Sequence, residues 1–171
     1  MARRTINEKT NKIALAGLLV ALMLVLGFVE SLIPTGTIPG IKLGLSNGVL
    51  IFAIYILGIP TAFVLMLLKV VLSGLMFGGV SAMIYAFAGG LLSMIVMSLL
   101  SRVKGVSPVV VSIAGGVMHN VGQVAMAMVM TNTPQLVYYM AILMMVGFVC
   151  GALTGICANQ VMKHMKKINR I

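Results

Sequence analysis

The stretch that decides the fold is GGVMHNVGQV, residues 115–124, inside an apolar run over residues 108–130. A run of that length is typical of a transmembrane helix, which crosses a hydrocarbon layer of ~30 Å at ~1.5 Å per residue. Yet this one carries His119, Asn120 and Gln123 within five residues. Polar side chains are costly there, so they indicate either a clamp between helices or a wall of a binding site.

The composition of the rest of the chain agrees with a lipid environment. Of its 171 residues, 61% are hydrophobic and only 8% are charged. Apolar runs lie at residues 13–33, 41–58, 60–77, 79–101, 108–130 and 136–162. We therefore predict an all-α, polytopic membrane protein with six transmembrane helices, forming one membrane domain over residues 1–171.

The second of these runs is the weakest prediction of a transmembrane helix. Pro39, Gly40, Lys42 and Gly44 interrupt its start, and proline and glycine disfavour a regular helix. The run therefore also fits a short helix that follows a re-entrant loop.

Basic residues mark one side of the six-helix arrangement. Ten of the twelve lie in the N-terminal segment 1–12, in the loop 102–104 and in the C-terminal segment 163–171. By the positive-inside rule, both termini lie in the cytoplasm and the protein is a multi-pass component of a bacterial cell membrane. The net charge of +10 thus indicates topology. No nucleic-acid partner is expected, because no basic stripe is interleaved with aromatic residues.

Four ionisable residues lie away from these basic segments, namely Glu30, Lys42, Lys69 and His119. Lys69 and His119 follow prolines by nine and eleven residues, which puts both ~14–17 Å into the membrane if those prolines mark cytoplasmic ends. A charge at such depth normally faces a bundle interior, a partner or a water-filled cavity. The two residues are therefore candidates for one intramembrane site.

We interpret this site as a pocket open toward the outer face. Lys69 and Lys42 would supply charge, and His119, Asn120 and Gln123 would supply hydrogen bonds, since 119 and 123 share a helix face. Glu30 would compensate a lysine or gate the pocket. The alternative is an interhelical hydrogen-bond clamp without a ligand, and the sequence leaves both open.

Small residues at helical spacing predict close helix packing. Gly17 and Ala21 share a face of the first helix, and Gly89 and Gly90 lie in a stripe on the fourth. Without a hydrophobic drive between helices in lipid, such stripes let backbones approach. They fit packing within the bundle or docking of another membrane subunit.

Several kinds of catalysis are excluded by residues that the chain lacks. Its acidic residues are Glu8 and Glu30, and it has no aspartate, so paired-carboxylate and two-metal mechanisms are out of reach. It also has no phosphate-loop motif for ATP hydrolysis. We therefore expect no enzyme activity, no metal site and no cofactor, and binding or translocation of a small molecule instead.

Four sequence segments together resemble one family. PGIKLGLSN (39–47), LMLLKVVLSGLMFGG (65–79), AFAGGLLSMIVM (86–97) and GGVMHNVGQVAMA (115–127) are similar to the Gx transporters, a family also named heptaprenyl diphosphate synthase component I. That family in turn resembles the six-helix substrate-binding S components of energy-coupling factor transporters. The similarity covers the chain from the first helix onward.

The resemblance implies a binding component that works with other subunits. Substrate would lie in the outer half of the membrane, and the first helix would dock a transmembrane coupling subunit driven by two ATPases. The family motifs fall on Gly40, Lys42, Gly44, Asn47, Lys69, Gly89, Gly90, His119, Asn120, Gly122 and Gln123.

The chain departs from these patterns in two places. The docking motif of S components has alanines four apart, where this chain has Gly17 and Ala21. Prenyl synthases hold magnesium diphosphate through aspartates, which are absent here. The resemblance therefore also fits an accessory of isoprenoid or quinone metabolism, or a membrane part of a flavin- or quinone-linked extracellular electron-transfer system.

Overall fold

The computed structural model describes residues 2–32 and 44–168, and every regular element in this part of the chain is helical. The elements in chain order are α1 (Ala2–Ser31), α2 (Asn47–Ile56), α3 (Ile59–Ser73), the π-helical segment η1 (Gly74–Gly78), α4 (Gly79–Leu100), α5 (Pro108–Thr131) and α6 (Leu136–Ile168). The predicted all-α fold is confirmed for these residues.

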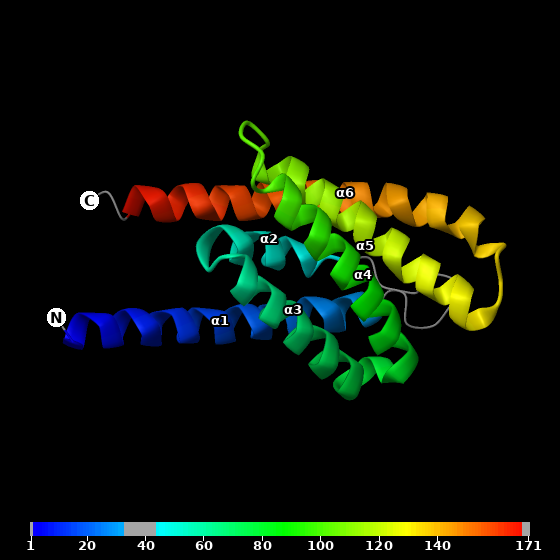
Figure 1. The fold of residues 1–171 in the computed structure, drawn as a ribbon, viewed down its shortest axis with the longest axis horizontal. Coiled ribbons are helices and arrows are strands. Elements are labelled where there is room, and N and C mark those ends of the chain that lie inside the picture. The colour runs from blue at the N-terminus through cyan, green and yellow to red at the C-terminus, as the bar shows by residue number, and fades with distance from the viewer. Residues whose placement is uncertain (1, 33–43, 169–171) are drawn as a thin grey trace.

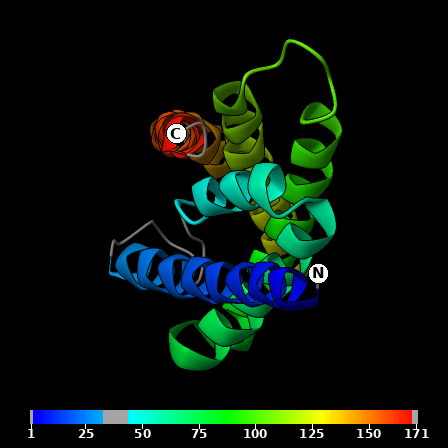
Figure 2. The ribbon, with the colours of Figure 1, turned by 90° about the vertical axis from the view of Figure 1, so that its left-hand side faces the viewer.

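Successive α-helices run in alternating directions (Figure 1). Helices α1, α3 and α5 run one way along the long axis and α2, α4 and α6 return. The start of α1 and the end of α6 consequently lie at the same end of the molecule, as the turned view in Figure 2 also shows.

Helix α5 is the centre of the bundle, because its contacts with α4 and α6 are the most extensive between any two elements. The short helix α2 lies inside, where it contacts α6, α3, α5 and α1. All of its residues from 47 to 54 are buried. A helix that is apolar on every side is typical of such an interior position.

Local sequence signals explain where helices α3 and α5 start. Helix α3 follows Gly58, whose φ is 90°, and has Pro60 in its first turn. Helix α5 starts at Pro108 after Ser107, whose side chain accepts a hydrogen bond from the Val110 amide. A proline in the first turn and a serine cap are both favourable at a helix start.

The chain reverses between α3 and α4. A Cβ added at Gly74 would lie 2.8 Å from Cβ of Met83, and one added at Gly90 would lie 2.9 Å from the Met66 sulfur, so the two helices pair antiparallel. Gly79 adopts a φ of 74°, which a side chain would disfavour. The π-helical turn and this glycine therefore form the hairpin.

The structure accounts for the predicted membrane spans in part. Four helical stretches are long and apolar enough to cross a bilayer, namely Lys9–Ser31, Ile59–Leu100, Pro108–Thr131 and Leu136–Met165. The third and fourth predicted spans fall together in Ile59–Leu100. The ten residues of α2 reach ~15 Å, about half of a ~30 Å hydrocarbon layer. The second predicted span is thus shorter than the apolar run 41–58.

Backbone atoms of α5 and α6 approach each other at glycines. A Cβ added at Gly116 would lie 2.5 Å from the Gly147 carbonyl oxygen, and one at Gly147 would lie 2.7 Å from the Gly116 oxygen. Close packing of this kind supplies van der Waals contact, which is a main source of helix association in lipid. These glycines join α5 to α6, whereas the small-residue stripes predicted from the sequence lie on the first and fourth helices.

We predict that Gly116→Ala lowers stability by about 1–3 kcal/mol, because the methyl group would meet backbone that cannot move aside cheaply. Thermal unfolding of the purified protein in detergent measures the change. Gly17→Ala is the matched control, since a Cβ there meets nothing within 4 Å and alanine favours a helix. Equal melting temperatures for the two variants would contradict the packing account.

Candidate functional site

The interior of the bundle contains an unusual set of polar side chains. The buried polar or charged residues are Glu30, Ser46, Asn47, Lys69, Ser73, Ser93, Ser112, His119, Asn120 and Gln123. They come from α1, α2 and the turn before it, α3, α4 and α5. Because a buried polar group is costly without a hydrogen bond, the partners of these residues reveal what the site does.

His119 and Gln123 form the centre of the site on α5. The His119 ring is 1% exposed and its Nε2 is hydrogen-bonded to Nε2 of the Gln123 amide. An amide nitrogen only donates, so the ring nitrogen accepts in this arrangement. The prediction that these residues share one face is confirmed by the bond between them.

The turn before α2 lies against the His119 ring. A Cβ added at Gly44 would lie 3.1 Å from His119 Cδ2 and 3.0 Å from Nδ2 of the Asn47 amide. Gly44 has a φ of 85°, so glycine is required here for conformation as well as for space. The family motif around Gly44 and Asn47 is thereby brought to the histidine of α5.

Glu30 holds this turn from the end of α1. One carboxylate oxygen, Oε1, accepts a hydrogen bond from the backbone amide of Leu45. Glu30 is 1% exposed, so its side chain lies inside the protein. The predicted compensation of Glu30 by Lys42 or Lys69 stays a prediction, since Lys42 lies outside the described residues.

Helix α4 closes the other side of the histidine. A Cβ added at Gly89 would lie 2.5 Å from the His119 backbone oxygen and 3.0 Å from its Nδ1. Gly90 faces Met66 of α3 instead. Both glycines are buried, in agreement with the packing predicted for them.

Asn120 points toward α6. Its amide Nδ2 donates a 2.6 Å hydrogen bond to the Leu143 backbone oxygen. This bond ties α5 to α6 in the way that the clamp interpretation requires. Its Oδ1 has no hydrogen-bond partner among the described residues. The Asn120 nitrogen thus joins two helices, and the Asn120 oxygen is left to accept a hydrogen bond from a ligand.

Lys69 lies on the buried face of α3. Leu65, Met66, Val70 and Ser73 share this face, and Lys69 is 2% exposed. Because Met66 and Val70 lie near Gly90, Lys69 sits at the level along α4 where Gly89 meets His119. The similar depth predicted for Lys69 and His119 agrees with this register.

Gly122 packs against Ala88 and Gly89 of α4, whereas two other predicted residues lie away from the cluster. Gly17 and Ala21 are exposed on the outer face of α1. Gly40 lies outside the described residues, as Lys42 does. The structure therefore brings together Glu30, Asn47, His119 and Gln123, and it puts Asn120 between α5 and α6.

Two contacts around the cluster were not predicted. A Cβ added at Gly115 would lie 3.2 Å from Ser93 Oγ, and Ser112 Oγ lies 3.4 Å from Thr154 Oγ1. Serines that alternate with apolar residues in a transmembrane run carry little signal, because each is able to bond to its own helix backbone. Only the packing of α4, α5 and α6 reveals them.

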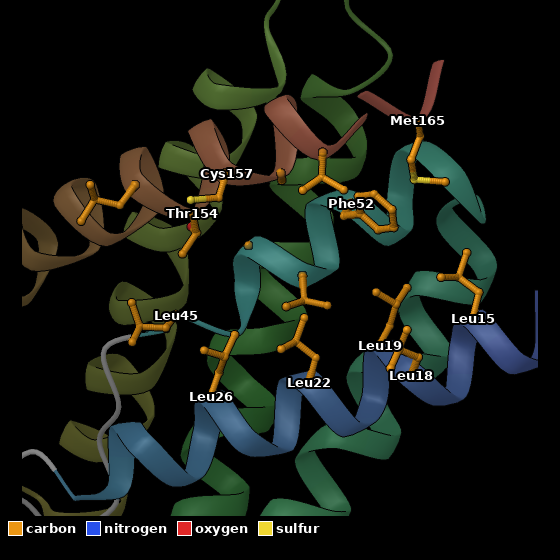
Figure 3. Close-up of a pocket in the computed structure, with 15 residues that line it drawn as sticks. Leu15, Leu18, Leu19, Leu22, Leu26, Leu45, Phe52, Thr154, Cys157 and Met165 are labelled. Atoms are coloured by element: carbon orange, nitrogen blue, oxygen red, sulfur yellow. The ribbon is translucent and has the colours of Figure 1, made fainter. Parts of the chain in front are cut away.

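An apolar groove adjoins the site between α1, α2 and α6, with a volume of about 520 Å³. Figure 3 shows Leu15, Leu19 and Leu22 of α1 directed toward Phe52 of α2 and Cys157 of α6. We call it the leucine groove. Leu45 and Gly48 line it, whereas Gly44 and Asn47 face the histidine, so the start of α2 separates the groove from the polar cluster.

The fold and the cluster together define the class: an all-helical protein with four helices able to cross a bilayer and polar side chains buried among them. A family model described as heptaprenyl diphosphate synthase component I matches residues 19–161, and the chain belongs to this family. No curated protein and no solved structure shows a significant match.

We predict that Gly44→Ala lowers the melting temperature more than Gly105→Ala does. Both glycines have positive φ, 85° and 87°, so both substitutions strain the backbone by about 1–2 kcal/mol. Only at Gly44 would the methyl group also crowd His119 and Asn47, because a Cβ at Gly105 meets nothing within 4 Å. Equal losses in thermal unfolding would show that Gly44 does not pack on the site.

Proposed function

We propose that this protein is the substrate-binding membrane component of an importer, similar to the S components of energy-coupling factor transporters. It binds a small molecule with an anionic or strongly hydrogen-bonding head at the cluster of Asn47, His119 and Gln123. Energy for import comes from other subunits, since the chain has no phosphate-loop motif.

The observation that carries this proposal is the state of the Asn47 side chain. It is 2% exposed, yet neither its Oδ1 nor its Nδ2 has a hydrogen-bond partner among the described residues. An amide buried in this way costs about 1–3 kcal/mol relative to a satisfied one. Such a cost is expected where a ligand supplies the missing donor and acceptor, as residues at binding sites are placed for function and not for stability.

The charges near the cluster favour an anionic or polar head. Lys69 is buried at the depth of the histidine, and Lys42 precedes Gly44 by two residues in the sequence. Carboxylates are scarce, because Glu8 and Glu30 are the acidic residues of the chain. Glu30 already accepts a hydrogen bond from the Leu45 amide. The balance of charge is suited to a ligand that brings negative charge or acceptors of its own.

The proposed topology has six passages with both termini in the cytoplasm. It is supported by the alternating directions of the helices and by the common end of α1 and α6 (Figure 1). The basic residues in 2–12 and 163–168 lie at that same end, and the positive-inside rule assigns it to the cytoplasm. In this proposal, the ligand reaches the cluster from the extracellular side of the membrane.

A coupling subunit would dock on the outer face of α1. Gly17 and Ala21 are exposed there, and neither lines the leucine groove. A surface with small residues at helical spacing permits close approach of another transmembrane helix. The partner that this surface fits is a transmembrane subunit associated with ATPases.

A second candidate is a non-catalytic membrane accessory of isoprenoid or quinone metabolism, or of flavin- or quinone-linked extracellular electron transfer. The bond from Asn120 to the Leu143 carbonyl favours it, because it shows polar residues of this motif used to join helices. The description of the family is in line with the isoprenoid version. The chain itself has no aspartate with which to hold magnesium diphosphate.

Two isosteric substitutions separate these candidates. We predict that Asn47→Leu raises the melting temperature of the ligand-free protein, because it removes a buried amide without partners. Asn120→Leu lowers stability by about 0.6–1.7 kcal/mol, because it removes an interhelical hydrogen bond. Thermal unfolding of both variants, after exhaustive washing in detergent, measures whether each substitution raises or lowers the melting temperature.

Native mass spectrometry of the same preparations before washing tests the binding function. Wild type is expected to retain a small molecule in stoichiometric amount, Asn120→Leu to retain it if folded, and Asn47→Leu to lose it. A wild-type protein that carries no molecule, together with an Asn47→Leu variant that is destabilised, would support the accessory role and overturn the importer.

A further inference from the structure

The leucine groove has a direction and two different ends. On α1 its wall runs from Leu26 to Leu15, and on α6 it runs from Leu153 to Met165. Leu26 and Leu45 line the first end, as Figure 3 shows. Leu15 and Met165 line the second end, on the side of the N-terminal part of α1 and the C-terminal part of α6 (Figure 1).

The length of the groove matches one leaflet of a membrane. Leu26 lies eleven positions after Leu15 on α1, and Met165 lies twelve positions after Leu153 on α6. These separations correspond to ~17–18 Å, slightly more than half of a hydrocarbon layer of ~30 Å. A transmembrane partner helix would need the full thickness, whereas the groove ends halfway at Leu45. Its dimensions therefore suit an extended hydrocarbon chain that enters from one membrane surface.

The end of the groove at Leu15 and Met165 carries positive charge. Lys12 lies one turn beyond Leu15 on α1, and His164 lies one turn beyond Val161 on α6, so both are on or beside the groove faces of their helices. Both are exposed, as are Lys9, Lys163 and Lys167 on the same helix ends. By sequence, Glu8 is the one acidic residue of these two segments, and the basic residues outnumber it. The electrostatic potential at this end of the groove is therefore positive and attracts anions.

We propose that the leucine groove binds an anionic phospholipid from the leaflet at the basic end of the molecule. One acyl chain lies along the groove between α1 and α6, and the phosphate head lies at the end near Lys12. This lipid site and the polar cluster are different sites with different ligands. The lipid proposal therefore does not depend on the function of the polar cluster.

A second apolar hollow, between α3 and α4, lacks this combination. It includes Arg102 but draws only on one turn of α3, from Ile59 to Phe63. A hydrocarbon chain would have a wall on one side for most of its length. The leucine groove, with three helices around it, is the better fit to a retained lipid.

Native mass spectrometry of the full-length protein, released from nanodiscs of equal amounts of phosphatidylcholine and phosphatidylglycerol, tests the proposal. Wild type is expected to retain one phosphatidylglycerol. Lys12→Gln should lower the preference over phosphatidylcholine about fivefold, the effect of roughly one lysine at an anionic surface. Lys104→Gln, which removes an exposed charge from the loop before α5, should leave the preference unchanged.

A pair of tryptophan variants tests the groove itself. Leu22→Trp fills it from α1, whereas Val25→Trp adds the same bulk at an exposed position of that helix that does not line the groove. Loss of retained lipid in Leu22→Trp alone supports the proposal, with circular dichroism showing that both variants are folded.

Three outcomes would overturn it: equal retention of the two lipids by wild type, equal effects of the two tryptophans, or displacement of phosphatidylglycerol by an equal amount of farnesyl phosphate. The last outcome would assign the groove to a prenyl chain. None of these results depends on whether a small molecule occupies the polar cluster, so the two proposals fail separately.

Discussion

The hydrocarbon around a membrane helix offers no hydrogen bonds, so every polar side chain carried inside has to find its partner in the protein or in what the protein binds. This constraint organises the structure. Glu30 accepts from the turn at Leu45, and Asn120 donates to the carbonyl of Leu143. The hydroxyls of Ser46 and Ser93 and the Asn120 Oδ1 have no partner among the described residues, but at Asn47 both polar atoms of the side chain lack one. This complete lack of partners at Asn47 is the reason for inferring a ligand.

Glycine makes these partnerships geometrically possible. The Asn120 amide reaches α6 at a point where Gly147 has no side chain to block it, and a Cβ there would lie 2.8 Å from Nδ2. Gly89 similarly admits the backbone and ring of His119. Glycines thus allow the helix backbones to approach closely, and this close approach lets polar side chains reach partners on the neighbouring helix.

The sequence predicted the helices and the unusual residues, but not how they meet. Apolar runs gave the six helical segments, and spacing of four put His119 and Gln123 on one face, because both signals are local. A short helix was one of the two alternatives that the sequence left open for the run 41–58, and α2 has ten residues. The contact of Gly44 with His119 joins segments 75 residues apart in the sequence, and no periodicity reveals such a pairing. Whether a polar residue forms a hydrogen bond to another helix or binds a ligand depends on the same contacts between distant segments.

An experimental structure of the full-length protein in a lipid nanodisc, at a resolution that shows side chains, tests the central claim most directly. The account predicts non-protein density within hydrogen-bond distance of the Asn47 amide and beside the His119 ring. A map in which the Asn47 amide is hydrogen-bonded to protein groups, with no additional density beside it, would contradict the account.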